Sequence, residues 1–226
     1  MTTWTEDDRL DALRGYDILD TDREAAFDDV TALIARLCDA PIAVINLIDS
    51  DRQWFKSEVG LGVRETPLET SFCRHALLES ERLVVPDATA DARFACNPLV
   101  TETDGLRFYA GVVLRTGEGL PLGTLCVLDT KPRPEGLTDL QSRALEVLAG
   151  QVMGMLDLRR ALAAGRRGDA ELQRTMAALA ESESRYRAIA ESMPQMVWST
   201  RPDGFHDYYN ARWYEFTGVP AGSTDG

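Results

Sequence analysis

The sequence has no apolar run that approaches the roughly 20 residues of a membrane-spanning helix. Its N-terminus is acidic, with Glu6, Asp7 and Asp8, and lacks the basic and apolar regions of a secretory signal. Lysine and arginine together number 24 against 37 acidic residues, so the formal net charge is −13. Such a charge repels phosphate backbones and anionic lipids, and we therefore expect no nucleic-acid or membrane-surface partner.

Closely spaced cysteines are also lacking. Cys38, Cys73, Cys96 and Cys126 lie far apart and form no C-x-x-C pair, a pattern typical of reduced thiols in a cytosolic protein. We therefore predict a cytoplasmic location. Cys73-x-His75 with distant Cys96 and Cys126 is not a usual ligand spacing for zinc, so we expect no metal site. No other cofactor is evident from the sequence.

The first part of the chain mixes short helices with strands. Residues 41–48 read as a strand whose even-numbered and odd-numbered apolar residues point to opposite faces, which predicts a central strand covered on both sides. Further strands are predicted at 53–59, 82–85, 107–114 and 122–128, and Thr21-x-x-Glu24 has the spacing of a capping box before a helix. Ser71 or Thr70 is expected to cap another short helix. The fold class is therefore α+β, an antiparallel sheet with flanking helices.

From Thr138 helical periodicity runs almost to Met193. Thr138-x-x-Gln141 is a second capping box. Two apolar series follow that do not share one heptad phase, and residues 165–169 between them predict a skip or break in the helix. A helix this long needs a partner, most simply the same helix of a second copy. The predicted dimer contacts are Leu145, Leu148, Val152, Met155 and Leu162.

The C-terminal residues predict a hairpin followed by one short helix. Asp203-Gly204 lies between two β-prone runs, and Asn210 opens a helical stretch with Trp213 and Tyr214. A hairpin plus one helix buries too little apolar surface to fold independently. We therefore expect the chain to be part of a longer, serially built protein.

Residues 13–129 resemble a GAF domain of the kind found at the front of bacterial sensor proteins. The matching segments are 16–21, 27–28, 41–49, 52–57, 71–76, 84–88, 93–94, 97–100, 107–111 and 122–129. Residues 184–218 resemble the opening of a PAS domain. The resemblance implies a GAF sensor domain at 1–137, a signalling helix at 138–183 and the N-terminal part of a PAS domain at 184–226.

This series resembles the input half of a sensor histidine kinase in a two-component system, and a cyclic-dinucleotide synthase or phosphodiesterase could carry the same front end. It implies a regulatory module without a catalytic centre. A stimulus would bias rotation or register of a dimeric helix, which relays it to a downstream kinase or other output domain.

GAF domains form a ligand cavity on one face, and the resemblance places an unidentified small molecule there. The predicted lining residues are Trp54, Phe72, Cys73, Phe94, Asn97, Arg107, Tyr109 and Thr124. Two alternatives stay open. The aromatic residues could simply fill the space as core, or Cys73 and Cys96 could correspond to the two thiols of free methionine-R-sulfoxide reductase, a GAF-type enzyme that cycles through a disulfide. His75 is expected to cap or pair locally, with Glu79.

Overall fold

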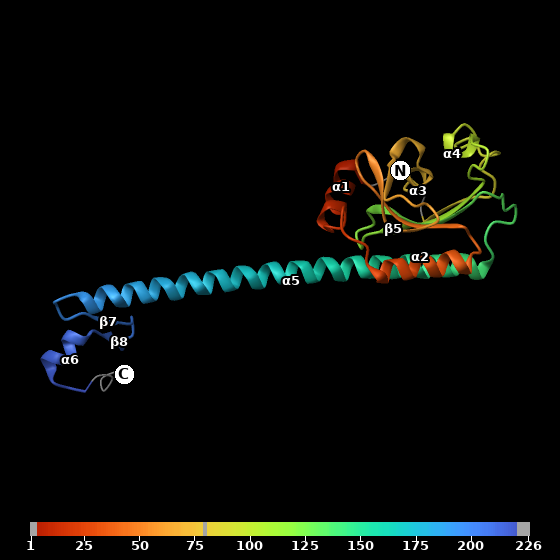
Figure 1. Cartoon of the computed structure of the whole chain (residues 1–226). Helices are drawn as coiled ribbons and strands as arrows, with labels where there is room; N and C mark the ends of the chain where they lie inside the picture. Colours follow the sequence, from red (N-terminus) through yellow and green to blue (C-terminus); the bar gives the residue numbers. More distant parts are fainter. Residues whose placement is uncertain (1–3, 79–80, 221–226) are drawn as a thin grey trace. The chain divides into compact units, whose positions relative to one another are not determined.

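The computed structural model describes residues 4–78 and 81–220. They fall into two compact units, with the boundary between residues 163 and 164. The first unit is an α+β domain, as predicted (Figure 1). Its sheet is antiparallel throughout, with strand order β3-β2-β1-β6-β5-β4. The strands are β1 (Ile42–Ile48), β2 (Arg52–Val59), β3 (Glu65–Pro67), β4 (Arg82–Val85), β5 (Phe108–Arg115) and β6 (Pro121–Asp129).

The central strand β1 is covered on both faces, and the predicted division of its side chains is confirmed. Ala43, Ile45 and Leu47 belong to one core, and Val44 and Ile48 belong to the other. The alternation follows from the pleat, because successive side chains of a strand point to opposite faces. Strand β6 is buried along its whole length because both faces of the sheet are covered there as well.

Helices of different lengths cover the two faces. On one face lie α1 (Glu6–Gly15), α2 (Ala25–Leu37) and the first part of α5 (Asp139–Ser192), with α2 next to α5 (Figure 1). On the other face lie a 3₁₀ turn (Leu68–Thr70), α3 (Phe72–Ala76) and α4 (Pro98–Thr101). The long helices close their face with a continuous core, whereas the short elements on the opposite face leave a cavity.

The two predicted capping boxes have different outcomes. At the start of α5, the Thr138 hydroxyl accepts a hydrogen bond from the Gln141 main-chain N–H, and the Gln141 side chain accepts one from the Thr138 N–H, so this box is confirmed. The box at Thr21 and Glu24 is wrong. Glu24 is itself the N-cap of α2, without a side-chain capping bond, and the Thr21 hydroxyl donates to the Ile18 carbonyl. The Glu24 carboxylate instead binds two cationic side chains described below.

Helix α5 runs without interruption through Gly165 and Gly168, so the predicted break is wrong. The change of apolar phase has another cause. Leu145 and Val152 are buried in the core of the first unit, together with Ala149, Met153 and Leu156. Further along the helix a different set of apolar side chains is exposed: Leu158, Leu162, Leu172, Met176, Leu179 and Tyr186. The two series therefore mark two faces of one helix.

This packing corrects the predicted dimer contacts. Leu145 and Val152 are 2% and 0% exposed within their own chain, so a second copy cannot reach them. Leu148 and Met155 are partly buried against the same core. Leu162, which is 53% exposed, is the predicted contact that stays open to a partner.

The second unit contains the predicted hairpin and helix. Strands β7 (Trp198–Thr200) and β8 (His206–Tyr209) pair antiparallel, and α6 (Ala211–Thr217) follows. Asn210 holds these pieces on the end of α5: its amide nitrogen donates to the Ala190 and Gln195 carbonyls, and its oxygen accepts from the Val197 and Trp213 main-chain N–H groups. Its side chain is fully buried. The prediction that this region is the start of a PAS domain stays a prediction.

Candidate functional site: an apolar cavity on the open face of the sheet

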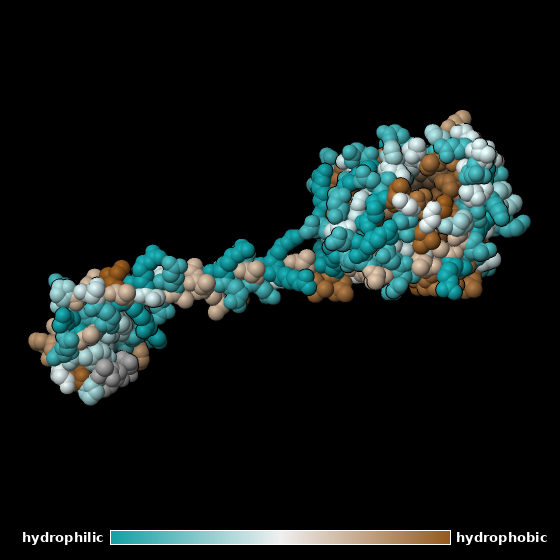
Figure 2. All heavy atoms as spheres, viewed as in Figure 1, coloured by the Kyte–Doolittle hydropathy of each residue, from teal (hydrophilic) through white to brown (hydrophobic). Residues whose placement is uncertain are grey.

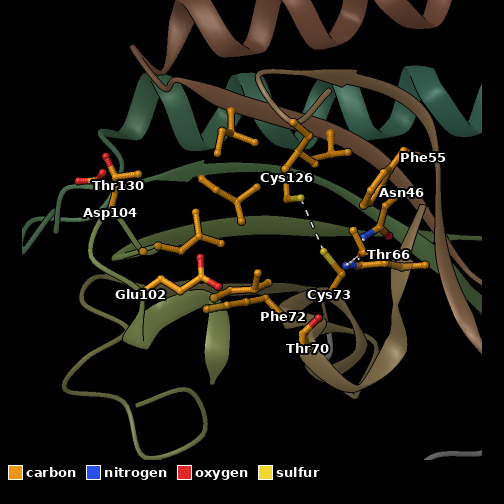
Figure 3. Close-up of a pocket in the computed structure, with 18 residues that line it drawn as sticks. Asn46, Phe55, Thr66, Thr70, Phe72, Cys73, Glu102, Asp104, Cys126 and Thr130 are labelled. Atoms are coloured by element: carbon orange, nitrogen blue, oxygen red, sulfur yellow. Dashed lines mark hydrogen bonds between the residues drawn. The ribbon is translucent and has the colours of Figure 1, made fainter. Parts of the chain in front are cut away.

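A cavity of about 230 Å³ lies between the sheet and the short elements α3 and α4 (Figure 3). In Figure 2 apolar side chains gather in a hollow at this part of the surface. The apolar lining comes from β1, β2, the loop after β2 and β6 on one side and from α3, α4 and the loop after α4 on the other. It consists of Ile42, Val44, Phe55, Leu61, Phe72, Leu99, Leu106 and Leu128. Such a lining suits a small, largely apolar molecule, since sites for drug-sized ligands span roughly 300–1,000 Å³.

A group of hydrogen-bonded amides and hydroxyls contributes to the wall. The Gln53 side-chain oxygen accepts from the Asn46 amide at 3.2 Å and from the Ser71 hydroxyl at 2.7 Å, and its nitrogen donates to the Thr66 hydroxyl. Asn46, Gln53 and Ser71 are buried. Their polar atoms bind one another, which fixes the shape of this wall before any ligand enters.

Two thiols lie side by side in the wall. Cys73 is on α3 and Cys126 is on β6, and their sulfur atoms are 3.7 Å apart. The Tyr109 hydroxyl donates to the Cys73 sulfur at 3.5 Å. Because of the neighbouring Cys73 thiol and of burial, the pKa of Cys126 lies well above its ordinary value. Burial also raises the pKa of Tyr109 well above its usual range.

Charge at the cavity is of one sign. Glu102 and Asp104 belong to the lining, and both are exposed. Among the described residues that line the cavity there is no lysine, arginine or histidine. An anionic ligand would therefore meet two carboxylates and no matching cation, whereas a neutral or cationic ligand meets no such opposition.

Two of the eight predicted lining residues, Phe72 and Cys73, line the cavity. Trp54 lies on the other face, in the core with α2 and α5. Its neighbour Phe55 faces the cavity instead, because adjacent residues of a strand point to opposite faces.

The remaining five predicted residues support the wall from behind. Phe94 stacks on Phe72 with ring centroids 4.2 Å apart, and Asn97 caps α4 while its amide donates to the Thr70 carbonyl. Arg107 donates to the carbonyls of Val100 and Leu106. Tyr109 and Thr124 are fully buried, and Thr124 Oγ1 makes no hydrogen bond within the described part of the chain.

Several lining residues were not predicted, including Asn46, Gln53, Leu106 and Cys126. Strand alternation could have identified Cys126 and Leu128, which lie on the same face of the sheet as Val44. Leu106 belongs to an irregular loop that carries no periodic signal. The prediction of a His75–Glu79 pair falls partly outside the described residues, since residue 79 is not among them; the His75 ring meets the edge of Phe94 at 5.0 Å.

A second polar cluster joins α5 to the N-terminal part of the first unit. Lys56, on β2, is fully buried, and its ammonium group donates to Glu24 Oε1 at 2.7 Å, to the Asp22 carbonyl at 2.6 Å and to the Thr21 hydroxyl at 3.0 Å. The same Glu24 oxygen accepts from Arg159 on α5.

These contacts shift the pKa of both partners. Burial lowers the pKa of Lys56. Burial acts to raise the pKa of Glu24, but its hydrogen bond to Lys56 and the charges of Lys56 and Arg159 lower it overall. Nearby, the Tyr16 hydroxyl donates to Asp157 at 2.6 Å, and burial together with this bond raises the pKa of Tyr16 to about 12. The cluster therefore fixes α5 just after Leu156, its last fully buried leucine.

Among residues 4–78 and 81–220, the helices lack a stretch with the length and hydropathy of a membrane span, and no group of three or more metal-ligating side chains is present.

Comparisons with known proteins place these features in a family. A sequence model of the GAF domain matches residues 22–156. A cyclic di-GMP phosphodiesterase of Pseudomonas aeruginosa is 40% identical over 139 residues, which cover 62% of this chain and 24% of that protein. The chain thus spans about a quarter of that relative's length.

Solved structures show the same fold at low identity. The GAF domain of a phosphoenolpyruvate-protein phosphotransferase from Coxiella burnetii has a TM-score of 0.52 and 16% identity, covering 69% of this chain and 96% of that one. A free methionine-R-sulfoxide reductase from Neisseria meningitidis, solved with its substrate, has a TM-score of 0.50 and 18% identity, covering 72% of this chain and 97% of that one. At such identities the likeness concerns the fold alone.

Proposed function

Because this chain belongs to the GAF domain family, a family of sensory and regulatory modules, we propose that it is the input module of a signal-transduction protein. A small molecule binds in the apolar cavity, and helix α5 relays the event to an output domain. The observation that carries this proposal is the double role of strand β6. Cys126 and Leu128 face the cavity, whereas Leu125 and Val127 lie in the core that contains α5.

A ligand that moves the cavity wall therefore also moves residues of the core to which α5 contributes. Coupling of this kind requires two arrangements of one element whose balance the ligand shifts. A coupling free energy of about 1–3 kcal/mol changes output several-fold. The Glu24, Lys56 and Arg159 cluster holds α5 at the end of this contact and would transmit the shift.

We further propose that α5 pairs with the same helix of a second copy. The exposed apolar residues Leu158, Leu162, Leu172, Met176 and Leu179 follow one heptad register, with spacings of four, ten, four and three. Such a stripe is typical of a coiled-coil seam. If the full chain stays monomeric in light scattering at high micromolar concentration, this part of the proposal fails. Met176→Lys with Leu179→Lys should shift a dimer to monomer, and the exposed pair Arg185→Lys with Arg187→Lys is the control.

For the output we propose a histidine kinase, which the predicted PAS start supports. The relative at 40% identity supports a second candidate, a cyclic di-GMP phosphodiesterase. The two are distinguished by the longer protein: incubation with ATP labels a histidine in the first case, and cyclic di-GMP is hydrolysed in the second.

The charge of the cavity lining points to a neutral or cationic ligand. Three compounds with one ring system test it by thermal shift: indole, tryptamine and indole-3-acetate. Binding raises the melting temperature in proportion to RT ln(1 + [L]/Kd), so indole or tryptamine should raise it and the anion should not. Leu106→Trp, which fills the cavity from its loop, should abolish the shift. A stronger shift with indole-3-acetate, or none with all three, contradicts the proposal.

The reductase alternative stays a prediction with a simple test. The structure places the Cys73 sulfur against Cys126, while Cys96 is exposed. Turnover of free methionine sulfoxide that disappears in Cys96→Ser would support it, and absence of turnover in the wild-type chain would remove it.

A further inference from the structure

The sulfur atoms of Cys73 and Cys126 lie against each other in the cavity wall (Figure 3). The two residues are 53 positions apart in the sequence, so the fold, and not chain proximity, brings them together. Their sulfurs are 3.7 Å apart. A disulfide needs about 2.05 Å, so an approach of about 1.7 Å would join them.

We propose that Cys73 and Cys126 form a redox site, a dithiol that hydrogen peroxide or another small neutral hydroperoxide converts to a disulfide. This role goes beyond ligand sensing and does not depend on it. The small volume of the cavity excludes bulky oxidants. Its described lining carries two carboxylates and no cationic side chain, which disfavours anionic oxidants, and both Cys73 and Cys126 belong to that lining. Cys96 is exposed, and Cys38 lies in the core on the opposite face of the sheet.

The contacts assign different roles to the two thiols. Cys73 receives a hydrogen bond from the Tyr109 hydroxyl, which stabilises a thiolate, so Cys73 attacks the peroxide. Its sulfur bonds to one peroxide oxygen, the O–O bond breaks, and the departing hydroxide takes up the proton of the Cys73 thiol as water. The Cys126 sulfur then attacks the resulting sulfenic acid, the S–S bond forms, and the S–O bond breaks with loss of a second water. Two thiols are oxidised and one peroxide is reduced to two waters.

The bond would change the shape of the cavity. Cys73 lies on the five-residue helix α3 next to Phe72, whose ring stacks on Phe94, whereas Cys126 lies in the middle of a strand that is paired on both sides. The helix is the more weakly held partner, so closing the bond draws α3 and Phe72 toward the sheet. The oxidation state of the thiols would then set the space open to a ligand.

The test is peptide mapping of the full native chain after graded hydrogen peroxide. Remaining thiols are alkylated in denaturant, and the protein is digested without reductant. We expect loss of two of the four free thiols, a linked peptide pair that contains Cys73 and Cys126, and its disappearance after dithiothreitol. In Cys126→Ser, Cys73 should instead be trapped as sulfenic acid by dimedone. In Cys96→Ser the linked pair should form as in wild type.

Three results overturn the proposal. The first is no loss of thiols before the chain unfolds, and the second is a bond between Cys73 and Cys96. The third is that Cys73 gives the same oxidation product in wild type and in Cys126→Ser. The wild-type map requires no substitution, so a variant that fails to fold leaves the test intact. Disulfide formation without any indole or tryptamine shift would retain the redox site while removing the proposed ligand class. A thermal shift with indole or tryptamine without disulfide formation would retain the proposed ligand class and remove the redox site.

Discussion

Glu24→Gln should destabilise the first unit far more than the usual loss of a surface ion pair. The substitution keeps the shape of the side chain and removes its charge, which leaves the fully buried Lys56 ammonium without a counter-ion. Removing one partner of a completely buried ion pair costs about 3–5 kcal/mol. Glu24 is 39% exposed, so water screens part of the interaction, and the Asp22 carbonyl still accepts a hydrogen bond from Lys56. We therefore expect a loss of about 1.5–3 kcal/mol, the range for a hydrogen bond to a charged group.

A matched control exists within the same unit. Glu146 on α5 is 38% exposed and also contacts two arginines, Arg82 and Arg143, but it faces no buried charge. Glu146→Gln should cost about 0–1 kcal/mol. Stability is measured in urea from the alkylation rate of buried cysteines, since all four cysteines lie in the first unit and three are buried. Equal effects of the two substitutions would refute the dependence of Lys56 on Glu24.

The same pair predicts a pH dependence. The folded-state pKa of Glu24 is lowered, so its contribution to stability is complete above its unfolded pKa and is lost as the pH falls through the folded value. Wild type and Glu24→Gln should thus differ most at neutral pH and converge in acid. Lys56→Met combined with Glu24→Gln removes both charges and should unfold at a higher urea concentration than Glu24→Gln alone. A difference that grows in acid would contradict this assignment.

Three further tests probe the packing, and two of them include a matched control substitution. Leu156→Ala should cost about 2–5 kcal/mol because Leu156 is 1% exposed, whereas Leu158→Ala, at 61% exposure, should stay within about 0.5 kcal/mol at concentrations below any dimerisation. Gly123→Ala should prevent normal pairing of β6, since its Cβ would overlap a main-chain carbonyl of β1, and Gly117→Ala, in open space, should be tolerated; circular dichroism distinguishes them. Asn210→Ala should unfold the β7–β8 hairpin and α6 without changing alkylation of the buried cysteines, as followed by tryptophan fluorescence; intact fluorescence would contradict this role.

The sequence predicted what depends on periodicity and missed what depends on loop geometry. The two faces of β1 followed from alternation, and the second capping box followed from spacing. The prediction that Trp54 lines the cavity is wrong because the position of a residue in the pleat, and not its aromatic character, decides which face of the sheet its side chain occupies. The interpretation of residues 165–169 as a break was wrong because a change of apolar phase can also mean that one helix uses two faces.

Most residues that line the cavity could not be predicted from sequence patterns. Leu106, Glu102 and Asp104 lie in irregular backbone whose path depends on Arg107 and its bonds to main-chain carbonyls. The contact between Cys73 and Cys126 depends on the register of β6 and on the docking of α3. Neither leaves a local signature.

The uninterrupted burial of β6 limits how such a domain can be re-engineered or can diverge. Inserting or deleting one residue in that strand would exchange its two sets of side chains, so that residues of the cavity wall enter the core that contains α5 and residues of that core enter the cavity. A new ligand specificity of the cavity is therefore more readily obtained by changes in the loop around Glu102 and Leu106, whose length and composition are not constrained by strand pairing. A designer of a biosensor on this scaffold should randomise that loop and leave the strand untouched.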